Sequence, residues 1–147
     1  MTDDRTLRTS RTLLFSAEEI YGAFSSPKLL AAWWGPEGFS NTFEIHDFIE
    51  GGRWKFVMHA PDGTNYQNES TFEALEPNSK IVIHHDCPPR FRLTIELTAE
   101  DHGTRVTWNQ VFEDAETAQV VKERAGPANE QNLDRLTRVL EQTRSGI

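Results

Sequence analysis

Hydrophobic and polar residues alternate through most of the middle of the chain, from residue 41 to residue 112. Such alternation predicts antiparallel strands that have one covered face and one face toward water. Segments rich in glycine, proline, asparagine and aspartate, such as Pro61-Asp62-Gly63, separate the strands and suit chain reversal. The covered face would carry Trp54, Phe56, Met58, Phe72, Phe91, Leu93, Ile95, Trp108 and Phe112.

The region before residue 41 predicts one strand and two short helices. Residues 6–15 are rich in threonine and leucine and are typical of a strand. Ser16 with Glu19 forms the pattern of a capping box, which begins a helix. Pro27 suits the first position of a second helix, because its missing N–H costs nothing there.

The chain after Asp114 predicts helix again, in two pieces. The first piece reaches about residue 124, and we expect Gly126-Pro127 to break it before a second piece at 128–143. Asp134 and Arg138 are four residues apart with the acid first, the favourable order for an ion pair on a helix surface. The apolar face of the second piece consists of Leu133, Leu136, Val139 and Leu140.

The order of these elements predicts a single α+β domain over residues 1–147, with the last amphipathic helix covering one face of a curved sheet. The net charge of -8 and the pI near 5.1 disfavour nucleic acid and anionic membrane surfaces as partners. We expect no membrane insertion, because no apolar run is long enough to cross a bilayer. The polar N-terminus and a single cysteine, Cys87, favour a cytoplasmic protein.

Four stretches carry a family resemblance: Phe24-Ser25-Ser26-Pro27 leading to Trp33-Trp34-Gly35-Pro36, then Glu50-Gly51-Gly52-Arg53-Trp54, Pro61-Asp62-Gly63 and Leu133-Asp134-Arg135-Leu136. With them, the chain resembles the START-like (SRPBCC) superfamily and, within it, the branch named after activators of the ninety-kilodalton heat-shock-protein ATPase. The resemblance implies the helix-grip fold, in which a curved antiparallel sheet wraps around a long C-terminal helix. Members of the superfamily bind lipids, hormones or polyketides, cyclise polyketides, or act as co-chaperones.

One position departs from the family pattern. The pattern has a Gly-Trp pair at the start of the last helix, where this chain has Ala128-Asn129. If that tryptophan lines the pocket in relatives, its replacement implies a larger or more polar pocket here.

We therefore predict a protein that binds a small apolar or amphipathic ligand in an internal cavity, since a curved sheet that grips a helix tends to leave one. Gln110 and one histidine would orient the polar end of the ligand. The alternative is that the same side chains simply fill a core, and that Trp33 and Trp34 only anchor the short helices. The candidate lining residues are Trp33, Trp34, Trp54, Phe56, Met58, Phe72, Phe91, Leu93, Trp108, Gln110, Leu133, Leu136 and Leu140.

The sequence predicts no catalytic residue, no metal site and no cofactor. His84-His85-Asp86-Cys87 contains metal-ligand types, but adjacent strand residues point to opposite faces, so we expect a solvated strand end. A polyketide cyclase remains an alternative, with acid–base groups drawn from a few polar residues, and so does a co-chaperone. A homodimer through a sheet edge or loop is compatible with the exposed sheet. The residues that could serve a cyclase are His59, Tyr66, His84, Asp86 and Gln110.

Overall fold

Seven strands form one antiparallel sheet in the computed structural model, which describes residues 4–144. The strands are β1 (Thr6–Leu13), β2 (Ser40–His46), β3 (Gly52–His59), β4 (Asn65–Glu76), β5 (Lys80–His85), β6 (Phe91–Glu100) and β7 (Gly103–Phe112). Their order across the sheet is β1-β7-β6-β5-β4-β3-β2, so the first strand pairs with the last. The predicted alternation is confirmed: in β3, Trp54 and Phe56 are buried, whereas Arg53, next to Trp54, is exposed.

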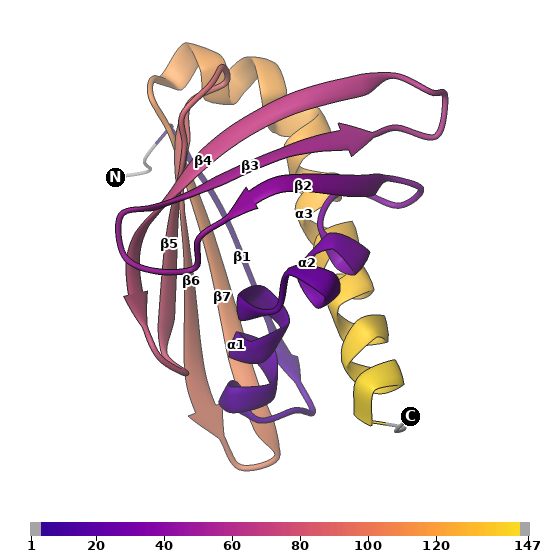
Figure 1. Cartoon of the computed structure of the whole chain (residues 1–147). Helices are drawn as coiled ribbons and strands as arrows, with labels where there is room; N and C mark the ends of the chain where they lie inside the picture. Colours follow the sequence, from indigo (N-terminus) through magenta and orange to yellow (C-terminus); the bar gives the residue numbers. More distant parts are fainter. Residues whose placement is uncertain (1–3, 145–147) are drawn as a thin grey trace.

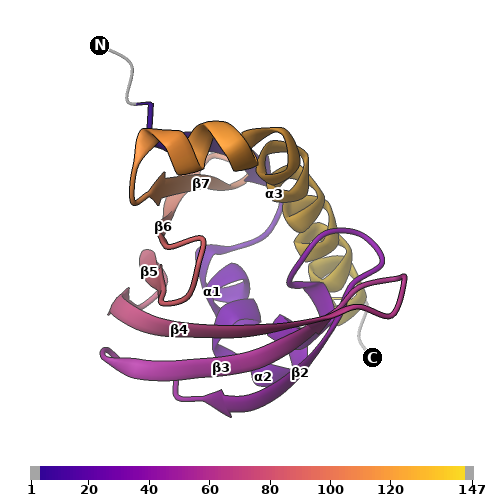
Figure 2. The ribbon, with the colours of Figure 1, turned by 90° about the horizontal axis from the view of Figure 1, so that it is seen from above.

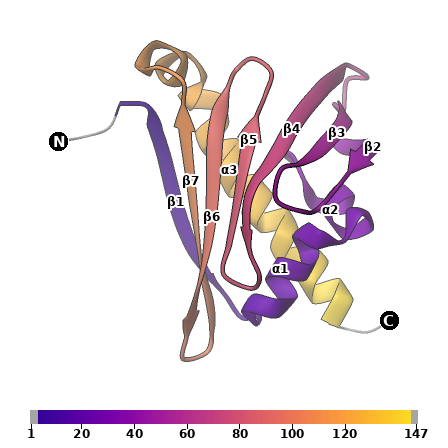
Figure 3. The same ribbon diagram turned by 60° about the vertical axis from the view of Figure 1, so that its left-hand side comes forward.

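Three helices complete the fold: α1 (Ala17–Ser25), α2 (Pro27–Trp33) and α3 (Ala115–Arg144). The sheet curves around α3, while α1 and α2 lie between β1 and β2 (Figure 1). Turned to the side, α3 runs diagonally across the sheet behind β6 and β5 (Figure 3). This is the predicted α+β helix-grip architecture.

The starts of the two short helices follow from their capping residues, as the sequence predicts. The Ser16 hydroxyl accepts from the Glu19 backbone N–H at 3.1 Å, and the Glu19 carboxylate accepts from the Ser16 N–H at 3.0 Å. The Ser26 hydroxyl accepts from the Leu29 backbone N–H at 3.3 Å and so caps α2, whose first residue is Pro27. These bonds satisfy backbone donors that a helix start leaves open.

The prediction that Gly126-Pro127 divides the last helix is wrong. Helical structure continues from Ala115 to Arg144 with Pro127 inside it. Figure 2 shows instead a sharp bend, with the first part crossing above β7 and the second running down the sheet. Proline removes one hydrogen bond and its ring crowds the preceding turn, so it bends a helix that packing holds together on both sides.

The expected ion pair between Asp134 and Arg138 does not form either. Asp134 pairs with Arg11 of β1 at 2.6 Å, and Arg138 pairs with Glu37 before β2, also at 2.6 Å. Long side chains on α3 thus reach the neighbouring elements, and the pairs tie α3 to the sheet edge and to the segment after α2.

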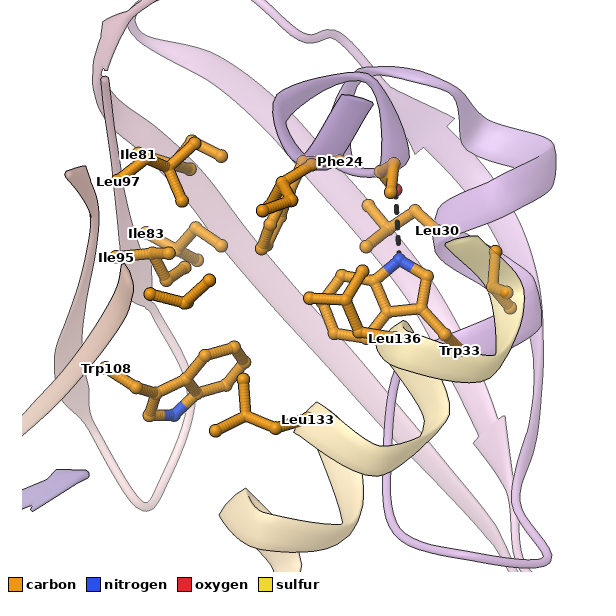
Figure 4. Close-up of a cluster of buried hydrophobic side chains, with 14 of the residues drawn as sticks. Phe24, Leu30, Trp33, Ile81, Ile83, Ile95, Leu97, Trp108, Leu133 and Leu136 are labelled. Atoms are coloured by element: carbon orange, nitrogen blue, oxygen red, sulfur yellow. Dashed lines mark hydrogen bonds between the residues drawn. The ribbon is translucent and has the colours of Figure 1, made fainter. Parts of the chain in front are cut away.

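The apolar core lies between α1, α2, the sheet and the second part of α3. Phe24, Leu30 and Trp33 from the short helices meet Leu133 and Leu136 from α3 (Figure 4). The Trp33 indole N–H donates to the carbonyl of Ala23 at 3.0 Å, which anchors α2 on α1. Among residues 4–144, no helix is long and apolar enough to cross a membrane.

Candidate functional site: a cavity beside the bend of the last helix

A cavity of about 200 Å³ lies between the concave face of the sheet, the residues that follow α2, and α3 just after its bend. Five strands, β3 to β7, contribute to its wall. The lining residues are Trp34, Gly35, Pro36, Phe56, Met58, Asn68, Ser70, Ile83, His85, Phe91, Leu93, Trp108, Gln110, Asn129 and Asn132.

The structure brings about half of the predicted lining residues to this cavity and leaves the rest in the core. Those at the cavity are Trp34, Phe56, Met58, Phe91, Leu93, Trp108 and Gln110. Those placed in the buried apolar cluster instead are Trp33, Trp54, Phe72, Leu133, Leu136 and Leu140. The two adjacent tryptophans therefore have different roles: Trp33 anchors α2, and Trp34 forms part of the cavity wall.

Buried polar side chains concentrate around this cavity. Six polar side chains of the described residues are buried, and all but Thr104 line it. Burying a polar group costs free energy unless a hydrogen bond compensates it, so a cluster of this kind is not expected in a core that only stabilises the fold. The five are Ser70, His85, Gln110, Asn129 and Asn132.

Sequence reasoning missed four of these five, although the signals were present. Ser70 follows the alternation of β4 with Phe72, and His85 follows that of β5 with Ile83, so both must face the concave side. Asn129 stands four residues before Leu133 and Asn132 four residues before Leu136, so both belong to the buried face of α3.

Two amides join α3 to the cavity wall. Asn129 Nδ2 donates to Gln110 Oε1 on β7 at 3.0 Å, and Asn132 Oδ1 accepts from the backbone N–H of Gly35 at 2.7 Å. Asn129 is one of the two residues at which we expected a departure from the family pattern, and its bond to Gln110 puts an amide pair in the cavity wall.

Trp108 lines the cavity, and its buried indole carries an unpaired donor. Its side chain is 1% exposed, and its indole Nε1 has no hydrogen-bond partner among the described residues. Figure 4 shows its six-membered ring toward the apolar cluster and its nitrogen on the far side of the ring. Trp54 Nε1 is also buried and unpaired, but Trp54 does not line the cavity.

His85 is the one titratable side chain among the lining residues. Its ring stacks on Phe91 with centroids 4.6 Å apart, and its Nδ1 lies 2.8 Å from the carbonyl oxygen of Pro89. Its Nε2 lies 2.8 Å from Asn68 Oδ1 and 3.5 Å from Cys87 Sγ. Burial lowers the pKa of the His85 imidazole, which favours the neutral form at pH 7.

The prediction of a solvated strand end holds for His84 but is wrong for His85. His84 turns to the outer face and pairs with Asp86 at 2.6 Å, whereas His85 is 8% exposed and faces inward. The two adjacent histidines thus point to opposite faces, as strand geometry requires. No group of three or more histidine, cysteine, aspartate or glutamate side chains within residues 4–144 could hold a metal ion.

The candidate acid–base groups do not meet at the cavity. Of the five polar residues considered for cyclisation, only Gln110 lines it. His59 bonds to Thr42 and Asn65 on the exposed side, and Tyr66 is 50% exposed.

Arg135 fixes the wall that Trp34, Gly35 and Pro36 form. Its Nη1 donates to the carbonyls of these three residues at 3.1, 2.8 and 2.9 Å. Its Nη2 donates to the carbonyls of Ala32 and Phe39 at 3.0 and 2.9 Å. Burial lowers the pKa of the guanidinium, which stays charged at any physiological pH. Arg135 therefore bonds along most of the turn between α2 and β2, beside the bonds that Asn132 and Arg138 make to it.

The comparisons with known proteins agree on family and fold. The family model described as "Activator of Hsp90 ATPase homolog 1-like protein" matches residues 14–141. A crystal structure of a protein from Nitrosomonas europaea is similar with a TM-score of 0.88 and 20% identity, covering 97% of this chain and 98% of that chain. One from Chromobacterium violaceum has a TM-score of 0.83 and 26% identity, covering 91% and 96%. The AHSA1-like protein from Aeromonas hydrophila has a TM-score of 0.76 and 20% identity, covering 94% and 93%. No protein with a curated description matches the chain.

Proposed function

The chain belongs to the family of activator of Hsp90 ATPase homolog 1-like proteins, and from this premise we propose that it binds a small molecule in the cavity beside the bend of α3. The observation that carries the proposal is the gathering of five of the six buried polar side chains around one cavity. Side chains that only filled a core would be apolar there, because each buried polar group adds a desolvation cost. Polar groups set in an apolar wall are typical of ligand sites.

Thermal-shift screening of the purified protein tests the proposal. The library should range from one-ring aromatics to flavonoids, fatty acids and sterols. A ligand at a hundredfold excess over its dissociation constant stabilises the folded state by about 2.7 kcal/mol, which raises the melting temperature by roughly 5–11 °C in a domain of this size.

Ser70→Leu locates the binding site, because a leucine there fills part of the cavity. Ser79→Leu is the matched control, since Ser79 is exposed in the turn between β4 and β5. Stabilisation by the ligand should disappear in Ser70→Leu and persist in Ser79→Leu. Absence of any ligand from the whole library, or equal stabilisation of both variants, would reject the proposal.

Two rival functions have their own tests. A polyketide cyclase needs an acid–base pair in the cavity, and His85 is the single titratable group that lines it. A co-chaperone would stimulate the ATPase of a heat-shock protein, and we expect no stimulation by this chain. A stimulated ATPase would move the search from ligands to protein partners.

A further inference from the structure

We propose that the ligand is an uncharged molecule of about one ring that carries a carboxamide or a similar neutral group, and that this group binds the side-chain amides of Gln110, Asn129 and Asn132. The inference rests on the proposed function and specifies the chemistry of the same cavity. It follows from the hydrogen-bonding atoms that these amides leave open, from the charge of the cavity wall and from the cavity volume.

Three buried side-chain amides lie together in the cavity wall. Gln110 is on β7, and its partner Asn129 stands three residues before Asn132 on α3, which makes the two asparagines neighbours on the helix surface. The exposed fractions of Gln110, Asn129 and Asn132 are 7%, 8% and 7%. Buried amides are normally hydrogen-bonded, because an unpaired polar atom away from water costs free energy.

Each of these amides uses only one of its two polar atoms within the protein. Asn129 Nδ2 donates to Gln110 Oε1 at 3.0 Å, and Asn132 Oδ1 accepts from the backbone N–H of Gly35 at 2.7 Å. Gln110 Nε2, Asn129 Oδ1 and Asn132 Nδ2 bond to no described residue. Unlike the indole nitrogen of Trp108, these three atoms are not closed off by their surroundings, so a molecule the size of water can touch them. The wall therefore offers two open donors and one open acceptor.

A carboxamide matches this set of open atoms. Its carbonyl oxygen would accept from the N–H groups of Gln110 and Asn132, and its own N–H would donate to Asn129 Oδ1. The open atoms of Gln110 and Asn129 flank the bond that joins the two residues, so we expect one planar group to reach both. If the two linked amides exchange their N and O positions, one donor and one acceptor still remain open there. Water can also bond these atoms, and a ligand that displaces it keeps its affinity only if it makes the same bonds.

The charge of the wall favours a neutral group over an ion. No lining residue is aspartate, glutamate, lysine or arginine, and burial lowers the pKa of His85, the lining residue that titrates. A carboxylate at the amides would lose its hydration without gaining a counter-charge. We therefore expect a neutral amide to bind more tightly than a carboxylate of the same shape.

The volume limits the ligand to about one ring. The cavity has a volume of about 200 Å³. An apolar protein cavity of about 150 Å³ accepts one benzene molecule. The additional space allows a few more non-hydrogen atoms, which is enough for a carboxamide substituent. A sterol or a flavonoid is too large for a cavity of this volume.

Four probes of one planar skeleton separate these requirements: benzamide, acetophenone, α-methylstyrene and benzoate. They have the same number of non-hydrogen atoms and differ only at the two terminal atoms of the substituent. Their dissociation constants can be measured by ligand-observed NMR at pH 8, with flavanone and cholesterol as large probes. Benzamide should bind most tightly, acetophenone about tenfold more weakly because it has no N–H, and α-methylstyrene about a hundredfold more weakly because it makes none of these bonds. Benzoate should also bind about tenfold more weakly than benzamide, or less tightly still.

A double variant, Gln110→Met with Asn129→Leu, locates the contact. It replaces both members of a hydrogen-bonded pair by apolar residues of similar shape, a change that can be nearly neutral for stability. Benzamide should lose its advantage in this variant, so that α-methylstyrene binds at least as tightly. Thr104→Val is the control, because Thr104 is a buried polar residue outside the cavity wall, and it should keep the order of affinities. If the double variant does not fold, the order of affinities in the unmodified protein still tests the proposal.

Each other outcome overturns the inference in a distinct way. Equal affinities for benzamide and α-methylstyrene would refute binding by the amides, and an unchanged order in the double variant would place the contact elsewhere. Benzoate binding as tightly as benzamide would refute the preference for a neutral group. Binding of flavanone or cholesterol without any one-ring probe would refute the size limit but leave the proposed function standing. Silence from every probe, large and small, would reject the inference and the proposed function together.

Discussion

Arg135→Met should destabilise the protein far more than a typical surface substitution. Arg135 is half-buried, and its guanidinium donates five hydrogen bonds to backbone carbonyls of the turn between α2 and β2. Methionine keeps much of the apolar stem but makes none of these bonds. The experiment therefore isolates the contribution of the guanidinium.

The magnitude follows from the number of bonds. A hydrogen bond contributes about 0.5–1.5 kcal/mol net, and the lower end applies here because water can reach some of the carbonyls that lose their partner. Five bonds at the lower end give about 2.5 kcal/mol, which corresponds to a loss of roughly 5–10 °C in melting temperature for a domain of this size. The stability of Arg135→Lys should fall between those of the unmodified protein and Arg135→Met, because one ammonium has three donors and cannot span five acceptors.

Urea denaturation followed by circular dichroism measures the free energy of unfolding, and calorimetry gives the melting temperature. Arg138→Met is the control: it is the same substitution three residues along α3, at an exposed residue whose partner is Glu37. An exposed ion pair contributes about 0–1 kcal/mol, so this variant should stay close to the unmodified protein. If both variants lose the same free energy, Arg135 does not hold the turn as argued.

Three further results are expected. Gly35→Ala should lower the free energy of unfolding, measured by urea denaturation, by about 1–3 kcal/mol, since Gly35 has φ +97° and a Cβ would lie 2.7 Å from Met58 Cε. Gly22→Ala in α1 should raise it by about 0.5–1 kcal/mol, because a Cβ there would have nothing within 4 Å. Because burial lowers the pKa of His85, the imidazole binds a proton more tightly in the unfolded chain than in the folded one, so the free energy of unfolding should fall as the pH drops from about 7 to 5. This fall should be less steep in His85→Gln and as steep as in the unmodified protein in the control His102→Gln, at an exposed turn. In native-state hydrogen exchange, α3 amides after Pro127 should be better protected than those before it, where Ala118 is the one buried residue; equal protection would contradict this.

Local sequence patterns were enough to predict the elements and their α+β order because each element carries its own signal, and the family resemblance supplied the helix-grip arrangement. Alternation placed Trp54 and Phe56 on the covered face, and the capping box at Ser16 marked the start of α1. The continuous but bent α3 could not be predicted in this way. Proline weakens a helix locally, and only packing on both sides of Pro127 decides whether the helix ends or bends.

The cavity itself was only partly predictable. Which side chains face inward follows from strand and helix periodicity, and this includes the overlooked residues Ser70, His85 and Asn129. Where the interior stays open depends on how side chains from the sheet and two helices fill a shared volume, which no local pattern contains. The ion-pair partners of Asp134 and Arg138 could not be predicted from local patterns either, because Arg11 and Glu37 lie far from them in the sequence.

The pairing of β1 with β7 has a consequence for folding during synthesis. Thr6 pairs with Val111 and Leu13 with Thr104, so the first strand has to wait for almost the whole sheet to be made. The strands from β2 to β7 pair with their chain neighbours and can form a meander as they leave the ribosome. Until β7 emerges, however, β1 has no partner, and closing so long a loop is slow because its entropy is lost before any contact compensates it. The nascent chain therefore carries an unpaired strand for most of its synthesis, and this interval is when it is most exposed to aggregation.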